Sequence, residues 1–118
     1  MDYICISPKE TLLTAMSFIK RNKQRCVLLK NEKEKIIGVL SQGDIATALL
    51  TGTDPYAHVE TIANSEFSYL YERDMEKAYT IFKKKTLTLL PVLDKDYHLV
   101  DTITLQDIYQ YLEEGRNT

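Results

Sequence analysis

The stretch GVLSQGDI, residues 38–45, predicts a buried strand that runs directly into a helix. Its first residues form a short apolar run of the kind found in buried strands. Ser41 and Asp44 follow three residues apart, and at this spacing a hydroxyl and a carboxylate can cap the first turn of a helix. The same two groups can also bind a phosphate and the two hydroxyls of a ribose. The stretch by itself leaves both interpretations open.

A second copy of the pattern lies 63 residues further on, as DTITLQDI, residues 101–108. At this offset residues 5–52 align with residues 68–115 without a gap, although few positions are identical. An internal duplication is therefore expected. Two features of the strand-to-helix corner recur in it, the hydroxyl residue and the aspartate: Ser41 with Thr104, and Asp44 with Asp107.

Each half carries the apolar pattern of a helix, two strands and a second helix, behind a short extended segment. Apolar residues recur at i, i+3, i+4 and i+7 in the first helix of both halves, and short apolar runs mark the strands. The expected elements of the first half are an extended segment at 4–7, a helix containing 12–19, strands at 26–29 and 36–40, and a helix at 45–50. Those of the second half lie at 67–71, 75–82, 89–92, 99–103 and 108–113, and residues 59–63 are expected to add one helical turn.

These elements predict an α+β fold in one module, with a first repeat at residues 1–56 and a second repeat at residues 57–118. A half of about 50 residues is too short to close a hydrophobic core alone. The two repeats are therefore expected to pack face to face about a pseudo-two-fold axis. That arrangement would leave two equivalent clefts between them.

The composition argues against several classes of function. The 118 residues carry 15 basic and 17 acidic side chains, a net charge of −2, which is unsuited to binding nucleic acid or an anionic membrane. No apolar run approaches the roughly 18 residues of a membrane span. Cys5 and Cys26 lack metal-binding spacing, and His58 and His98 lie far apart. We expect reduced, buried thiols, no metal site and a cytoplasmic location. No nucleophile with a plausible base and no Walker or Rossmann glycine loop is present, so we expect no catalytic residues.

With both corners in place, the chain resembles a tandem pair of CBS domains, a regulatory unit also called a Bateman module. The resemblance rests on the duplicated corner motif and on the preceding strand LPVLD, residues 90–94. It implies that each repeat is a βαββα unit and that the module binds an adenine nucleotide (AMP, ADP or ATP) or S-adenosylmethionine. It also implies a homodimer formed through the helices of the module, with Tyr109 and Tyr111 as candidates for the dimer face.

The resemblance further implies that the module controls a fused or partner enzyme. The stretch GVLSQGDIATALLTG, residues 38–52, is similar to modules attached to bacterial sugar nucleotidyltransferases. A nucleotidyltransferase of this kind is therefore a candidate for the regulated enzyme.

A nucleotide site needs an acceptor for the ribose hydroxyls and a place for phosphate. An ionised aspartate accepts from both ribose hydroxyls through charge-assisted hydrogen bonds, and the free N–H groups of a helix N-terminus favour phosphate. Asp44 and Asp107 are expected in the first role, and Ser41 and Thr104 would add a hydroxyl in the second.

The resemblance adds two residues from the start of the central strands. It implies that Arg25 binds phosphate in the cleft of Thr104 and Asp107, and that Thr88 belongs to the cleft of the other corner. The predicted nucleotide-binding residues are Ser41, Asp44, Thr104, Asp107, Arg25 and Thr88.

A competing hypothesis is an interaction module that dimerises but whose degenerate clefts bind nothing. Few basic side chains stand near either aspartate in the sequence, and Asp101 replaces the glycine that usually opens the motif. Asp101 adds a negative charge near any phosphate. Under this hypothesis the two corners serve only as helix caps.

Overall fold

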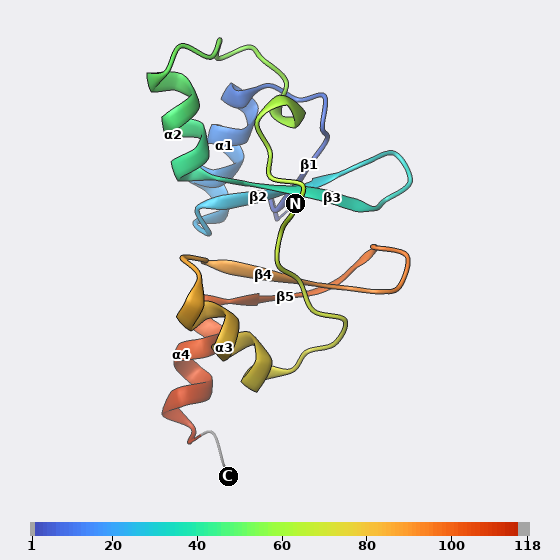
Figure 1. The fold of residues 1–118 in the computed structure, drawn as a ribbon, viewed down its shortest axis with the longest axis vertical. Coiled ribbons are helices and arrows are strands. Elements are labelled where there is room, and N and C mark those ends of the chain that lie inside the picture. The colour runs from blue at the N-terminus through green and yellow to red at the C-terminus, as the bar shows by residue number, and fades with distance from the viewer. Residues whose placement is uncertain (1, 116–118) are drawn as a thin grey trace. The chain divides into compact units, whose positions relative to one another are not determined.

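In a computed structural model that describes residues 2–115, the chain forms two compact units, Met1–Phe67 and Ser68–Thr118. Each unit combines a small β-sheet with two α-helices (Figure 1). The α+β class expected from the sequence is therefore confirmed. No helix within residues 2–115 has the length and apolar character needed to cross a bilayer.

The first unit is built on a three-stranded sheet in the order β1-β2-β3. Strand β1 pairs parallel with β2, and β2 pairs antiparallel with β3. Both α-helices lie on one side of this sheet (Figure 1). The elements are β1 (Cys5–Ile6), α1 (Leu12–Asn22), β2 (Cys26–Lys30), β3 (Ile36–Ser41), α2 (Gln42–Leu50) and the 3₁₀ helix η1 (Val59–Thr61).

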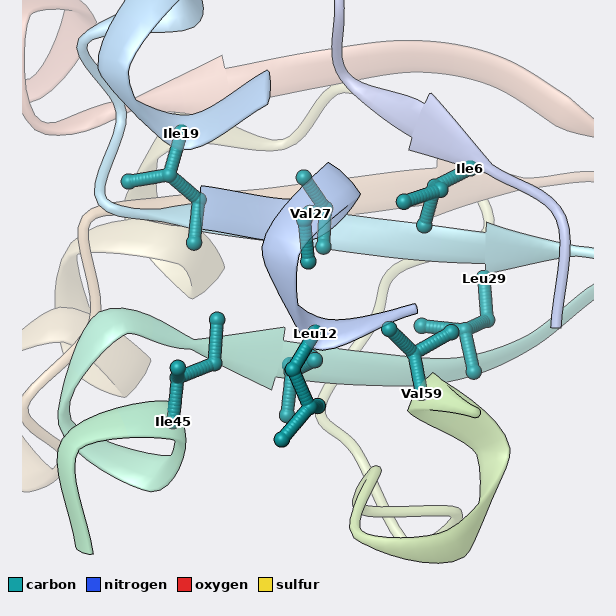
Figure 2. Close-up of a cluster of buried hydrophobic side chains, with 9 residues drawn as sticks. Ile6, Leu12, Ile19, Val27, Leu29, Ile45 and Val59 are labelled. Carbon is teal, nitrogen blue, oxygen red and sulfur yellow. The ribbon is translucent and has the colours of Figure 1, made fainter. Parts of the chain in front are cut away.

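The core of the first unit lies between the sheet and its helices (Figure 2). Helix α1 buries one face because its apolar residues follow the helical period. Strand β2 contributes alternate residues, which lie on the side of the sheet that faces the helices. The fully or nearly fully buried members are Ile6, Leu12, Ala15, Ile19, Val27, Leu29, Leu40, Ile45 and Val59.

The second unit repeats this plan with a two-stranded antiparallel sheet. Its elements are α3 (Met75–Lys84), β4 (Leu89–Leu93), β5 (Leu99–Thr104) and α4 (Leu105–Glu113). Its core contains Ala78, Leu90, Val92, Ile103 and Ile108. The extended segment expected at 67–71 makes a parallel bridge from Leu70 to Val92 rather than a strand.

The duplication inferred from the sequence is present in the fold at the same offset. Strands β2 and β3 and helix α2 begin 63 residues before β4, β5 and α4 respectively. The register irregularity between Leu29 and Lys30 recurs between Val92 and Leu93. The helix-strand-strand-helix order expected for each half is therefore confirmed.

The second helix of each unit begins earlier than the apolar pattern indicated. The apolar spacing covers residues 45–50 and 108–113, whereas α2 begins at Gln42 and α4 at Leu105, as the possible capping residues Ser41 and Thr104 indicated. The first turn of each helix is polar on its exposed side, so apolar periodicity does not reveal it. A hydroxyl residue that caps the helix marks the true start.

The segment that follows α2 packs on the first unit. Val59 is fully buried in the first core, and the expected turn at residues 59–63 is present as η1. The backbone N–H of Leu12 donates to the carbonyl of Ala57, and Val39 exchanges two backbone hydrogen bonds with Asn64. The compact units therefore divide between Phe67 and Ser68, while the repeat boundary at residues 56 and 57 stays a prediction.

Candidate functional site

The first corner joins β3 to α2 through Ser41. This residue is the N-cap of α2, with extended backbone angles φ −90° and ψ 160°. The backbone N–H of Asp44 donates to Ser41 Oγ at 3.0 Å, and the backbone N–H of Ser41 donates to Asp44 Oδ2 at 3.1 Å. The two reciprocal bonds form a complete capping box.

The second corner joins β5 to α4 in the same way. Thr104 is the N-cap of α4, and its Oγ1 accepts from the backbone N–H of Asp107 at 3.2 Å. The backbone N–H of Thr104 donates to Asp107 Oδ2 at 2.8 Å. The capping interpretation of the motif is therefore confirmed at both corners.

Capping leaves one carboxylate oxygen available in each corner. The hydrogen bonds and the ion pair that the carboxylates of Asp44 and Asp107 form with other residues in the range 2–115 all use Oδ2, so Oδ1 of each has no such partner there. Asp44 is exposed and Asp107 half-buried. Each corner can therefore cap its helix and still present an acceptor to a ligand hydroxyl.

Arg73 lies at the second corner and was missed by sequence reasoning. Its Nη1 is 3.0 Å from Asp101 Oδ2 and donates to the carbonyl oxygen of Thr102 at 3.0 Å. Its Nη2 is 3.5 Å from Asp107 Oδ2. The negative charge that Asp101 adds at this corner is therefore paired with the Arg73 guanidinium.

Little in the sequence indicates that Arg73 lies at the second corner. The residue stands directly before Asp74, the N-cap of α3, and it aligns with Glu10 in the first repeat, so the repeat gives no indication of a cation. Its partners come from β5 and α4, and Asp101 is 28 residues away in the sequence. Their proximity to Arg73 could be predicted only from the three-dimensional arrangement of the strands and helices in this unit.

Arg25 and Thr88 each lie beside the corner of their own unit. The backbone N–H of Gln42, the residue after Ser41, donates to the carbonyl of Arg25 at 2.8 Å. The equivalent bond runs from Leu105 to Thr88 at 3.0 Å. The side chain of Arg25 borders a cavity between α1 and α2. The assignment of Arg25 and Thr88 to the opposite corners stays a prediction.

A further polar cluster lies in the hairpin between β4 and β5, where ligand atoms of Asp94, Asp96 and His98 come within 4.8 Å of one another. The Asp94 carboxylate accepts from the backbone N–H groups of Asp96 at 2.8 Å and His98 at 2.9 Å. The hydrogen bond from His98 is the largest of the effects that lower the pKa of Asp94. The cluster therefore has the geometry of a turn closed by an aspartate.

Removing the capping hydroxyls should destabilise the protein whether or not the corners bind a ligand. We expect Ser41→Ala and Thr104→Ala each to lower the free energy of unfolding by about 0.5–2 kcal/mol, because each leaves a backbone N–H without its side-chain acceptor. Urea denaturation measures the change. Thr47→Ala, at an exposed position inside α2, is the control and should not destabilise. Equal stability of the cap variants and the wild type would contradict the capping role.

A family model of the CBS domain matches residues 1–51 and 59–114 of the chain. Among curated proteins, an uncharacterised protein of Methanopyrus kandleri is 28% identical over 112 residues, and the match covers 92% of this chain and 57% of that protein. The magnesium transporter MgtE of Thermus thermophilus is 26% identical over 118 residues, covering 95% of this chain and 25% of the transporter. The chain thus spans just over half of one relative and a quarter of the other.

Two solved structures share the fold over almost the whole chain. The CBS domain pair of protein MJ0100, in complex with 5-methylthioadenosine and S-adenosyl-L-methionine, has a TM-score of 0.79 at 19% identity and covers 97% of this chain and 90% of its own. The CBS domain protein PAE2072 from Pyrobaculum aerophilum, complexed with AMP, has a TM-score of 0.79 at 18% identity, with 95% and 92% covered.

Proposed function

Because this chain belongs to the CBS-domain family, we propose that it is a regulatory module that senses an adenosyl compound, either AMP, ADP, ATP or S-adenosylmethionine. CBS pairs form a regulatory, non-catalytic domain family. The two solved CBS pairs described above are complexes with adenosyl ligands. Because their identity to this chain is 18–19%, these structures show only a shared fold, and the binding of the same ligand class by this chain is a proposal.

The observation that carries the proposal is the duplicated corner with a free carboxylate oxygen. Oδ1 of Asp44 or Asp107 would accept from a ribose hydroxyl while Oδ2 keeps the helix capped. The hydroxyls of Ser41 and Thr104, with the positive ends of α2 and α4 behind them, would lie close to a phosphate. Arg25 and Thr88 are proposed as further contacts of the ligand.

Arg73 is proposed to raise the affinity of the second corner for phosphorylated ligands. Its positive charge is held near Asp107 by Asp101 and the carbonyl of Thr102. A phosphate at this corner would therefore meet a cation that the protein has already positioned, which lowers the cost of ordering a long side chain on binding.

Arg73→Gln should accordingly weaken AMP binding by roughly tenfold and adenosine binding much less, since a hydrogen bond to a charged group contributes about 1.5–3 kcal/mol. The variant also leaves Asp101 unpaired near the phosphate, which acts in the same direction. Titration calorimetry measures the affinities of the wild type and the variant for AMP and for adenosine. Lys77→Gln, on the exposed side of α3, is a charge-matched control. An equal loss for AMP and adenosine would contradict a phosphate-specific role.

The module would act by linkage, because a ligand shifts a conformational equilibrium only through its different affinities for the two states. The regulated activity is proposed to reside in a fused or partner protein. The stretch at residues 38–52 supports a sugar nucleotidyltransferase as the regulated protein. The similarity to MgtE supports a transporter in the same role. We further propose that the module is cytoplasmic and forms a homodimer.

The competing function is an interaction module whose corners bind no ligand. It is favoured by the contacts within the corners, because each aspartate caps its helix through Oδ2 and Arg73 forms an ion pair with Asp107. Under this hypothesis the predicted binding residues serve only the fold.

Titration of the purified chain with AMP, ADP, ATP and S-adenosylmethionine separates the two functions. We expect saturable heat with at least one of these ligands, together with a rise in the thermal midpoint, because a ligand that binds only the folded state stabilises it. Absence of heat and of a thermal shift with every one of them would support the interaction module.

A further inference from the structure

A cavity of about 510 Å³ lies between helices α1 and α2 of the first unit, a volume typical of sites for small ligands. The side chains of Ile19 and Ile45 are buried and point toward each other between the two helices (Figure 2). They form the floor of the cavity, and the small side chain of Ala46 leaves room in its wall. The apolar lining residues are Met16, Ile19, Ile45, Ala46 and Leu49.

The rim of this cavity is cationic. Three exposed side chains, Lys20, Lys23 and Arg25, border it, and none of them forms an ion pair with another residue in the range 2–115. None of the residues in that range that line the cavity is acidic. An apolar floor below a positively charged rim suits a ligand that combines an apolar body with a negative group.

Two of these cations lie at backbone positions that glycine adopts with less strain. Lys23 has a φ of 60° and Arg25 a φ of 63°, both in the left-handed region. The backbone N–H of Lys23 donates to the carbonyl of Ile19 at 3.1 Å and ends α1, where glycine is the usual residue in this conformation. The end of the helix therefore does not account for a lysine at position 23.

The aligned positions of the second unit carry neither feature. Lys83, which aligns with Lys20, already lies against an aromatic ring, with its Nζ 4.5 Å from the ring centroid of Tyr79. The other aligned positions carry larger or uncharged residues, so the combination of space and cations is particular to the first unit. These residues are Tyr79 for Met16, Phe82 for Ile19, Tyr109 for Ala46, Thr86 for Lys23 and Thr88 for Arg25.

We propose that the α1–α2 cavity binds a small amphipathic anion, namely a monocarboxylate with an apolar tail such as a medium-chain fatty acid. The tail lies on Ile19 and Ile45, and the carboxylate pairs with Lys23 and with the guanidinium of Arg25, whose planar fork matches a carboxylate. A nucleotide fits this cavity less well, because its ribose and base would place polar groups against the apolar floor. The inference goes beyond the proposed function, since it depends neither on ligand binding at the corners nor on the arrangement of the two units.

Titration calorimetry of the full chain with three ligands that share a ten-carbon tail tests the chemistry of the site. We expect saturable binding of decanoate, tighter than that of decanol by roughly tenfold, because only the carboxylate forms charge-assisted hydrogen bonds with the rim. Decyltrimethylammonium, which carries the opposite charge, should bind more weakly than decanol. Added salt should weaken the binding of decanoate and leave that of decanol unchanged, since ions screen exposed charges.

Filling the cavity tests its location. Ala46→Trp should weaken decanoate binding by roughly tenfold or more, because several methylene groups of the tail lose their buried contacts. Position 46 is exposed, so the variant is expected to fold, and circular dichroism verifies this. Tyr109→Trp places the same indole at the aligned position of the second unit and is the control, with unchanged decanoate affinity.

Lys23→Gly separates binding from folding at the rim. Glycine adopts the left-handed conformation readily, so the variant should be about as stable to urea as the wild type. It should nevertheless weaken decanoate binding by roughly two- to fivefold, the effect of losing one exposed ion pair. Lys95→Gly makes the same change in the exposed turn between β4 and β5 and should leave the affinity for decanoate unchanged.

Three results would overturn the proposal. The first is the absence of saturable decanoate binding, and the second is equal affinity for decanoate, decanol and decyltrimethylammonium. The third is an affinity for decanoate that Ala46→Trp leaves unchanged. Sedimentation equilibrium of the same variants identifies the alternative occupant: if decanoate does not bind and Ala46→Trp dissociates a dimer, the cavity receives a second copy of the chain and not an anion.

Discussion

Asp107→Asn should weaken the binding of AMP by roughly ten- to a hundredfold at the second corner. The loss of charge removes charge-assisted hydrogen bonds to the ribose, each of which contributes about 1.5–3 kcal/mol. Asparagine keeps a side-chain oxygen that can accept from the backbone N–H of Thr104, so the helix cap is preserved. The variant therefore separates the ligand role of Asp107 from its structural role, and titration calorimetry measures the affinity.

Asp101→Asn is the comparison variant for this experiment, because it removes a carboxylate that pairs with Arg73 without touching the proposed ribose acceptor. Asp101 also pairs with Arg73 but lies on β5 outside the capping box. We expect its amide variant to weaken AMP binding less than Asp107→Asn does, because Arg73 loses one ion pair but keeps its hydrogen bond to the carbonyl of Thr102. Asp44→Asn tests the first corner in the same way. Unchanged affinity in both the Asp44 and Asp107 variants would exclude a ribose site at either corner and favour the interaction module.

Leu40→Ala and Ile103→Ala should each lower the free energy of unfolding by about 2–5 kcal/mol. The two residues are aligned by the repeat, on β3 and β5, and each is fully buried in the core of its unit. Truncation of a large apolar side chain there removes buried surface and leaves a cavity that the surrounding strands and helices fill only in part. Urea denaturation measures both losses.

Leu50→Ala is the control for the two core variants, because Leu50 is 88% exposed near the end of α2. Its free energy of unfolding should stay within about 0.5 kcal/mol of the wild-type value. A core variant with a loss as small as that of Leu50→Ala would contradict the packing described for that unit.

The fold could be predicted from the sequence because its signals are local and occur twice. The apolar period of α1 and the short apolar runs of β2 and β4 specify these elements within a few residues, and the offset of 63 residues recurs in the fold. Apolar periodicity alone does not mark the starts of α2 and α4, because their first turns contain the polar residues Gln42, Asp44, Gln106 and Asp107. There the capping hydroxyl, and not periodicity, determines where the helix begins.

The capping boxes are likewise determined by the sequence itself, because a residue and its partner three positions later meet in the first turn of any helix. The ion pair of Arg73 with Asp101 is different: its members are 28 residues apart and come together only when the segment before α3 lies beside β5. The cavity between α1 and α2 could likewise be found only in the tertiary structure. The small side chain of Ala46 leaves space there only when the two helices pack beside each other. Spacing along the chain determines contacts within one helical turn, whereas contacts between distant segments depend on how the folded strands and helices place them.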